Sequence, residues 1–207
     1  MSRLLLAILL VAAPILCAGQ TDAPVRRPEV RVGDSWTYRS TNVLEQGTYE
    51  HETRVSFVDD KVILAVSTRK SDRKEFDSSW TLEWNAVTTY GGLMYRPHSG
   101  LFRFPLRIGS KHAVKYELLW PQRQVIESST DGSVTVAGWE TVEVPAGRFR
   151  AIKLELESVI RGASHMPERV QITYWYVPDV RRWVKYQFYT RQFTGGEELL
   201  EYKLNED

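Results

Sequence analysis

Apolar and polar residues alternate with a period of two over most of the chain beyond its first thirty residues. In residues 75–84, EFDSSWTLEW, Trp80 and Leu82 fall on one face, while mostly charged side chains fall on the other. Ile152 and Leu154 alternate with charged residues in the same way. Because successive side chains of a β-strand point to opposite faces, the pattern predicts strands with one buried face. We expect these four apolar side chains to be buried.

Turn sequences rich in glycine, proline and aspartate separate the alternating runs, and no helical spacing is sustained after residue 18. Short strands with tight connections are typical of antiparallel meanders, whose edges are protected when the sheet curls or closes. The sequence therefore predicts an all-β protein, an antiparallel meander curled into an open or closed barrel-like sheet, with no substantial helix after residue 18.

Two glycine-containing patterns mark turns. Val144-Pro145-Ala146-Gly147 interrupts two alternating runs and predicts a tight turn between antiparallel strands, because proline presets the first corner and glycine accepts a positive φ. RVGDSWTY at residues 31–38 is echoed by RIGSKHAV at residues 107–114. The similarity fades after a few positions, so we interpret it as one turn solution used twice and not as an internal duplication.

The N-terminal residues have the three-part pattern of a secretory signal peptide: Arg3, an apolar stretch from Leu4 to Leu16, and then small residues. Cleavage after Ala18 fits best. Lipidation at Cys17 is a less favoured alternative, because Leu16 precedes the cysteine where a small residue is usual. An uncleaved anchor is less favoured still, because Pro14 interrupts the apolar stretch.

We therefore expect a signal peptide at residues 1–18, a flexible lead at residues 19–31 and a single β domain at residues 32–207, exported to the periplasm or the extracellular space. Removal of the signal peptide removes the only cysteine, so the mature chain relies on its core and not on disulfides. It also removes Arg3, which leaves 26 basic residues against 26 acidic ones. A neutral chain has no overall field to attract nucleic acid or an anionic membrane, and we expect no transmembrane segment in the mature chain.

Four segments carry a resemblance to a known family: VGDSWTYR, FPLRIGSK, VEVPAGRFRAIKLE and TYWYVPDVRRWVKYQ, in that order between Val32 and Leu204. Together they resemble the bacterial exported proteins grouped as domain of unknown function 3108 and its relatives. The resemblance implies a curved antiparallel β domain in the cell envelope, with no assigned reaction and no catalytic residues. The chain departs from the family pattern at His112, where an aromatic residue is usual, and at Arg181-Arg182, where a glycine usually follows Pro178-Asp179.

Signatures of catalysis are absent from the sequence. The four histidines (His51, His98, His112 and His165) are scattered without the spacing of metal ligands, no serine lies in Gly-x-Ser-x-Gly, and no cysteine follows the signal peptide. We expect no metal, no cofactor and no local catalytic residue. Carboxylates from separate strands remain able to meet, as in glycosidases built on β scaffolds.

Aromatic residues concentrate in the segment TYWYVPDVRRWVKYQFYT, residues 173–190, where rings occupy both faces of a predicted hairpin. One interpretation is a central hairpin covered on both sides, which is the more common arrangement. The other assigns ligand or partner contacts to outward-facing rings, with nearby arginines adding hydrogen bonds to an anionic group. The candidate binding residues under that hypothesis are Trp175, Trp183, Tyr189, Arg181 and Arg182.

These observations favour an exported cell-envelope protein that acts as a non-catalytic binding or scaffold module. Its partner would be an apolar ligand, a glycan or an envelope protein. The alternative is a hydrolase that acts on envelope polymers. A cluster of carboxylates or histidines inside an aromatic concavity would favour the hydrolase.

Overall fold

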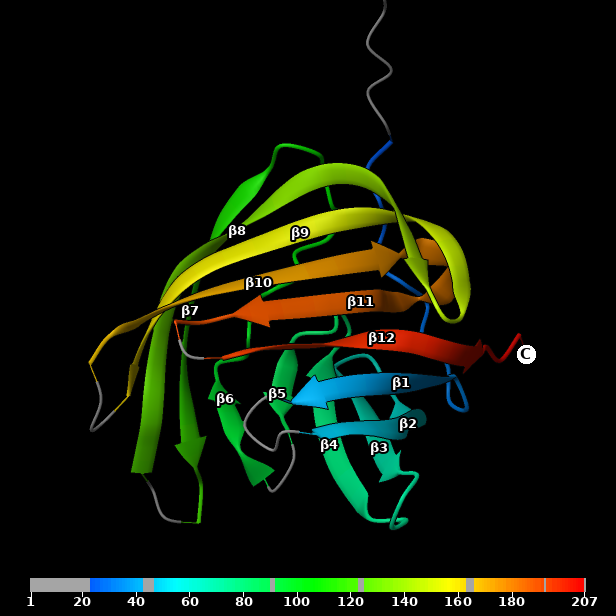
Figure 1. Ribbon diagram of the computed structural model, residues 1–207, viewed down its shortest axis with the longest axis horizontal. Helices are drawn as coiled ribbons and strands as arrows, with labels where there is room; N and C mark the ends of the chain where they lie inside the picture. The colour runs from blue at the N-terminus through cyan, green and yellow to red at the C-terminus, as the bar shows by residue number, and fades with distance from the viewer. Residues whose placement is uncertain are drawn as a thin grey trace, which may run out of the picture.

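The computed structural model describes residues 23–42, 47–89, 92–122, 125–162, 166–191 and 193–206, which form a closed antiparallel β-barrel (Figure 1). Its strands, in chain order, are β1 (Ser35–Asn42), β2 (Gly47–Val58), β3 (Val62–Arg69), β4 (Glu75–Thr81), β5 (Ala86–Thr88), β6 (Met94–Arg96), β7 (Lys111–Trp120), β8 (Val125–Val144), β9 (Gly147–Gly162), β10 (Glu168–Val177), β11 (Arg182–Tyr189) and β12 (Thr194–Lys203). A short 3₁₀ turn, η2 (Pro178–Val180), joins β10 to β11. No helix among these residues is long and apolar enough to cross a bilayer. The predicted all-β meander is confirmed.

Pairing between the first and last strands closes the barrel. Consecutive strands pair antiparallel around the sheet, and β1 pairs with β2 on one side and β12 on the other. Trp36 lies opposite Tyr202 and Tyr38 opposite Leu199 across the closing pair, which Figure 1 shows in blue and red. Closure leaves no free strand edge in the ring, which is how barrels avoid edge-to-edge association.

Burial follows the predicted alternation in β9 and departs from it near β4. Ile152 and Leu154 are buried, and Leu154 lies opposite Tyr174 of β10. Trp80 and Leu82 are only half-buried. Since β4 ends at Thr81, Leu82 lies beyond the strand, and Trp80 borders open space inside the barrel.

The repeated glycine pattern forms the same turn twice. Gly33 and Gly109 have φ values of 92° and 78°, which glycine adopts without a steric cost. In the first turn the amide of Asp34 donates to the carbonyl of Arg31 (3.1 Å), and in the second the amide of Ser110 donates to the carbonyl of Arg107 (3.0 Å). The two turns lead into β1 and β7, which confirms the interpretation as one turn solution used twice.

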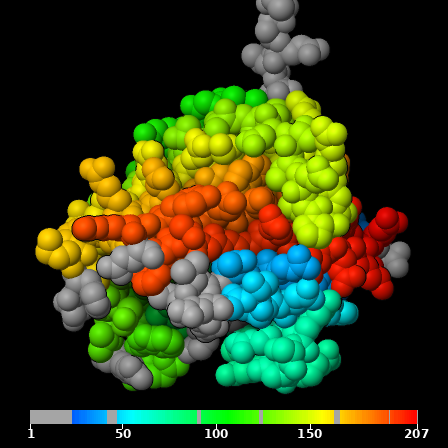
Figure 2. Space-filling view, in the orientation of Figure 1, coloured from blue at the N-terminus to red at the C-terminus, as the bar shows by residue number. Residues whose placement is uncertain are grey.

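The hairpin of β8 and β9 adds a second layer outside the barrel. Val144 pairs with Gly147, whose φ is 137°, so the predicted tight turn is present and consists of Pro145 and Ala146. The amide of Ala146 donates to the carbonyl of Leu199 in β12 (3.0 Å). The hairpin tip therefore crosses the outside of β10 and β11, and it covers part of the wall in the space-filling view (Figures 1 and 2).

The segment before β1 is anchored to the barrel at one point. Val25, within the range predicted as a flexible lead, is buried and exchanges two backbone hydrogen bonds with Leu106 (2.9 and 2.8 Å). Because both partners are core residues, this bridge ties the start of the described chain to the wall beside β7.

Candidate functional site

The barrel contains a cavity of about 290 Å³, bordered by strands β2 to β7, by the segments that join β5 to β7, and by β10, β11 and β12. Aromatic rings, small hydroxyl groups and the side chains of a histidine, an arginine and a glutamate predominate in its wall: Trp80, Tyr95, Tyr116, Tyr174, Trp183 and Tyr186, then Thr53, Ser67, Ser78 and Ser99, then His51, Arg182 and Glu197. Rings with a few convergent polar groups are typical of pockets for small molecules.

Two tyrosine side chains contribute neutral hydroxyl groups to the cavity wall. Tyr95 and Tyr174 are only half-buried by their neighbours. Nevertheless, burial raises the pKa of both hydroxyl groups well above the ordinary value for tyrosine. Both side chains line the cavity and remain neutral hydrogen-bonding groups at physiological pH.

Arg182 is the most unusual group in the cavity. The residue is 3% exposed, yet its Nε and Nη1 atoms have no hydrogen-bond partner. Its guanidinium carbon lies 4.3 Å from the ring centre of Trp183 and 4.5 Å from that of Trp84. The rings of three further residues, Trp36, Trp80 and Tyr38, lie 5.1 to 5.6 Å from the same carbon, which makes five rings in all. We call these residues the aromatic cage.

Ring faces compensate only part of the cost of burying a cation. A cation–π contact contributes about 0.5–2 kcal/mol, whereas taking an ion out of water costs several kcal/mol even after the protein relaxes. Buried arginines are therefore normally paired with a carboxylate or fully hydrogen-bonded. Among the described residues Arg182 has neither kind of partner, so its charge is buried in the cavity wall without a direct ion pair or hydrogen bond at Nε and Nη1.

A β-bulge explains why Trp183 lies inside, where the alternation predicts it outside. β10 pairs Trp175 with Lys185 and Tyr176 with Trp183, so Val184 is an extra residue in β11. The bulge shifts the alternation by one position, and Trp183 joins Tyr186 on the inner side. The prediction that Trp183 faces outward is therefore wrong.

Two other predicted aromatic residues lie away from the cavity. Trp175 faces outward, opposite Lys153 and Lys185, whose ammonium groups lie 6.0 and 5.8 Å from its ring centre. It is nevertheless 8% exposed, so it offers no open recognition surface. Tyr189, at the end of β11, is exposed, and its hydroxyl donates to Oε1 of Gln187.

Arg181 belongs to a hydrogen-bonded network at one end of the barrel. Its Nη1 atom lies 3.0 Å from both carboxylate oxygens of Asp34, which is fully buried, and also donates to the carbonyl of Asn205. Asp34 accepts from the amides of Arg31 (3.0 Å) and Asn205 (2.7 Å) as well. We call Asp34, Arg181 and Asn205 the end network. Its arginine is already paired, unlike Arg182.

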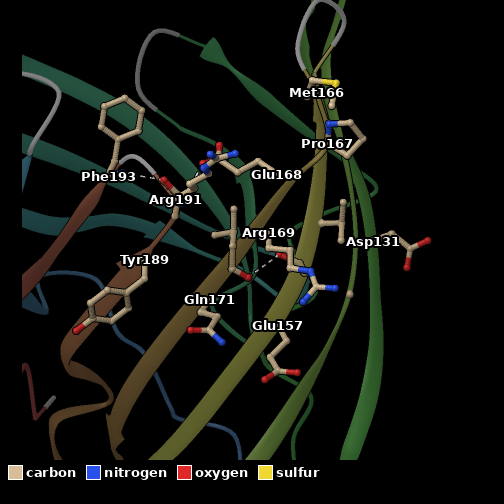
Figure 3. A pocket seen from close by; sticks show the side chains of 15 residues that line it. Asp131, Glu157, Met166, Pro167, Glu168, Arg169, Gln171, Tyr189, Arg191 and Phe193 are labelled. Atoms are coloured by element: carbon tan, nitrogen blue, oxygen red, sulfur yellow. Dashed lines mark hydrogen bonds between the residues drawn. The ribbon is translucent and has the colours of Figure 1, made fainter.

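A larger groove lies outside the barrel, across β8, β9 and β10 and beside the end of β11 (Figure 3). Tyr189 borders it, together with charged side chains of both signs such as Glu157 and Arg169. The groove is open to solvent and contains none of the unpartnered buried polar atoms found among the described residues. We therefore take the internal cavity as the candidate site.

His51 and Glu197 bring a second polar group into the cavity wall. His51 Nε2 lies 3.7 Å from Glu197 Oε1, which also accepts a hydrogen bond from Ser40 Oγ (3.0 Å). Burial lowers the pKa of His51; the positive charge of Arg182 lowers it further, and Glu197 opposes the shift. The imidazole is therefore neutral at pH 7, and Ser40 lies 3.3 Å from its Nδ1 atom.

Metal ligation finds no support in the part of the chain that the structure describes, where no group of three or more histidine, cysteine or acidic side chains could hold an ion. The amide of Gly100 donates to His98 Nδ1, and Nε2 of His112 lies 3.0 Å from the carbonyl of the same glycine. These contacts hold both histidines against the loop that contains Gly100. His165 lies outside the described residues.

Several cavity residues escape the sequence patterns. The cage residues Trp36, Tyr38 and Trp84 come from segments far from Arg182 in the chain, and His51 and Glu197 are 146 positions apart. One local signal exists: Arg182 sits among aromatic and β-branched residues at the start of a strand, where an arginine needs a reason to be buried.

Comparison with solved structures shows the fold. The hypothetical lipoprotein YmcC from Escherichia coli K12 is similar with a TM-score of 0.52 and 11% identity, over 81% of this chain and 84% of that protein. A candidate lipoprotein from Parabacteroides distasonis is similar with a TM-score of 0.51 and 13% identity, over 88% of this chain and 100% of that protein. The barrel is therefore an architecture shared with these two proteins.

Sequence comparisons add no family. No family model matches the chain, and no curated protein matches it. The resemblance to domain of unknown function 3108 thus stays a prediction that rests on the four sequence segments.

Proposed function

We propose that the protein is an exported cell-envelope module that binds a small ligand inside its barrel and catalyses no reaction. The signal-like N-terminus supports export, as do the names of the two structural neighbours, both described as lipoproteins. The motif resemblance to the exported proteins of domain of unknown function 3108 points to the same compartment.

The observation that carries this proposal is the unpaired guanidinium of Arg182. A buried donor without an acceptor costs about 1–3 kcal/mol, and more when it is charged. A protein that keeps such a group beside a ring-lined space gains stability when a complementary molecule enters. Arg182 is therefore the feature that distinguishes a binding cavity from a packing defect.

The hydrolase alternative has one observation in its favour, the approach of His51 and Glu197 in the cavity wall. A glycosidase mechanism needs two carboxylates, and Glu197 is the only acidic residue among the described residues that line the cavity. A serine mechanism needs an accessible nucleophile, whereas Ser40 is buried outside the lining and donates its proton to Glu197. Both mechanisms lack a required group, which favours binding.

The mature chain has two candidate forms, one without lipid and one with a lipid anchor, and a mass measurement separates them. Cleavage after Ala18 yields a mature chain that begins at Gly19 and carries no lipid. Lipidation instead yields a chain that begins at a diacylated Cys17, and the lipoprotein names of the structural neighbours add weight to this form. Residues 1–22 lie outside the described structure, so this choice rests on the sequence.

Native mass spectrometry of the protein purified from the organism that encodes it tests the binding function. We expect a small molecule to accompany the wild-type chain. The variant Ile172→Trp fills the cavity with an indole ring and should lose this molecule, because Ile172 lines the cavity on β10. Leu64→Trp on the exposed side of β3 is the matched control and should retain it.

The outcome separates three readings. Loss from Ile172→Trp alone supports binding in the barrel. Retention by both variants places the ligand elsewhere on the surface. A wild-type chain that carries no small molecule and takes none from an envelope extract overturns the proposal.

A further inference from the structure

We infer that the ligand is a small organic monocarboxylate with a flat apolar body, whose carboxylate pairs with Arg182. This inference rests on the proposed binding function and specifies the chemical class of ligand. It follows from the charge, the geometry and the size of the cavity, which lead to one description of the molecule.

Charge indicates an anion with a single negative charge. Arg182 has no ion-pair partner among the described residues, while His51 is neutral because burial lowers its pKa. Glu197 already contributes one negative charge to the same wall and shares it with Ser40. Glu197 repels any anion, so a monoanion that pairs with Arg182 meets less repulsion than a doubly charged phosphate ester.

The aromatic cage indicates how the anion approaches. Rings of Trp84 and Trp183 lie 4.5 and 4.3 Å from the guanidinium carbon, close enough to occupy the positions above the guanidinium where ring contacts form. Hydrogen bonds of a guanidinium lie in its own plane, and its fork of donors matches the two oxygens of a carboxylate. The cage thus holds the arginine in place and also covers its Nε and Nη1 atoms, so a carboxylate pairs with them only when a ring that borders the cavity, such as that of Trp80, moves aside.

Size and lining indicate the rest of the molecule. A volume of about 290 Å³ lies at the lower end of the range for small-molecule pockets, which is about 300–1,000 Å³. Rings from Tyr95, Tyr116, Tyr174 and Tyr186 face this space and favour stacked or edge-on contacts with a flat group. The ligand is therefore about the size of a single aromatic acid.

Calorimetric titration of the full chain with three probes of similar shape tests the class. The probes are benzoate, which carries one charge; benzyl alcohol, which is neutral; and phenyl phosphate, which is mostly doubly charged at pH 8. We expect benzoate to bind at least about tenfold more tightly than either of the others, the ratio typical of one charge-assisted hydrogen bond.

Variants of the arginine identify the contact. Arg182→Met should weaken benzoate binding at least about tenfold and leave benzyl alcohol unchanged, because it removes the charge and keeps an apolar side chain of similar length. Arg182→Lys should be intermediate, since it keeps the charge without the fork. Arg54→Met, on an exposed side chain of β2, is the matched control and should bind benzoate as the wild type does. Near-ultraviolet circular dichroism establishes that each variant keeps its packing.

Each contrary result has a distinct meaning. Equal binding of benzoate and benzyl alcohol, or unchanged benzoate binding in Arg182→Met, overturns the assignment of the carboxylate and leaves the binding function intact. Tighter binding of phenyl phosphate reassigns the ligand to phosphate esters. Absence of binding for all three probes, in a protein that carries a native ligand displaced by Ile172→Trp, rejects this ligand class but not the cavity as the site.

Discussion

Arg181 and Arg182 are neighbours in the chain, but their surroundings differ in almost every respect. In the end network, Arg181 contacts a buried carboxylate and a backbone carbonyl, and Asp34 accepts two backbone amides in addition. In the cavity, Arg182 is covered by five rings and lacks partners for two of its nitrogens. The first arrangement is complete, as a structural ion pair must be; the second lacks an acceptor, as a binding site does before its ligand enters.

The turn between β10 and β11 produces this divergence. Arg181 ends η2 in the left-handed region, with φ of 61°, and its amide donates to the carbonyl of Pro178. The exported proteins that the sequence motifs resemble usually have glycine near this point, and the positive φ provides a physical reason. Because the chain reverses at Arg181, the side chains of the two arginines leave toward the end network and toward the cavity. Two adjacent arginines on this turn therefore do not act as one functional unit.

The largest effect is expected when the end network loses its cation. Arg181→Ala should lower the free energy of unfolding by about 3–5 kcal/mol, because it leaves the fully buried carboxylate of Asp34 without a counter-ion. Arg181→Gly should cost about 1–2 kcal/mol less, since glycine adopts the left-handed conformation without strain. Urea unfolding of both variants measures the difference. A loss below 1 kcal/mol in Arg181→Ala would show that the ion pair is not structural.

A smaller loss is expected from Asp34→Asn. The backbone amides of Arg31 and Asn205 donate to different oxygens of Asp34, so the single oxygen of asparagine keeps only one of these hydrogen bonds, and the charge that pairs with Arg181 is lost. Hydrogen bonds to charged groups contribute about 1.5–3 kcal/mol, so we expect the free energy of unfolding to fall within that range. The same urea experiment applies. Equal losses in Asp34→Asn and Arg181→Ala would mean that charge alone accounts for the network.

At Arg182 we expect a substitution to leave the free energy of unfolding unchanged or to raise it. Arg182→Met removes a buried charge that has no direct partner in the ligand-free protein, and replacement of buried charges by apolar groups often changes stability little or raises it by about 1–4 kcal/mol. We expect no loss of stability. A gain should lie near the lower end of this range, because the contacts between the guanidinium and the cage rings are lost as well. Thermal unfolding without ligand provides the measurement. A clear decrease in stability would identify Arg182 as a structural cation and remove the contrast with Arg181.

The smallest effect concerns the pH dependence of stability. Burial lowers the pKa of His51 below its ordinary value of 6.5, so the folded protein binds fewer protons than the unfolded chain in the range just below that value. The stabilisation from neutral His51 is complete above about pH 6.5 and is lost as the pH falls through the folded-state pKa. His51→Asn should therefore flatten the decline in unfolding free energy between pH 8 and pH 5. His112, whose pKa burial also lowers, remains in both proteins and cancels in the comparison. An identical decline in both proteins contradicts the shift.

Local patterns predict much of the fold and little of the candidate site. The alternation in β9 and the turn at Pro145-Ala146 follow from residues within a few positions of one another, and both are confirmed. Trp183 shows where this reasoning fails, because a bulge of one residue reverses which face a side chain occupies. The sequence contains the same letters with or without the bulge, so the inner position of Trp183 could not be predicted from alternation alone.

The sequence by itself determined the period of the strands, the places where they turn and the all-β class, because these depend on side-chain alternation and on the backbone freedom of glycine and proline. Only the tertiary structure decided that the sheet closes, since β1 and β12 meet across more than one hundred and fifty positions of chain. It also decided that Trp175 is covered, that Arg181 is paired and that Arg182 is not. These outcomes depend on which distant groups share one small space, and the free energy of a buried charge is set by those neighbours and not by its own position in the sequence.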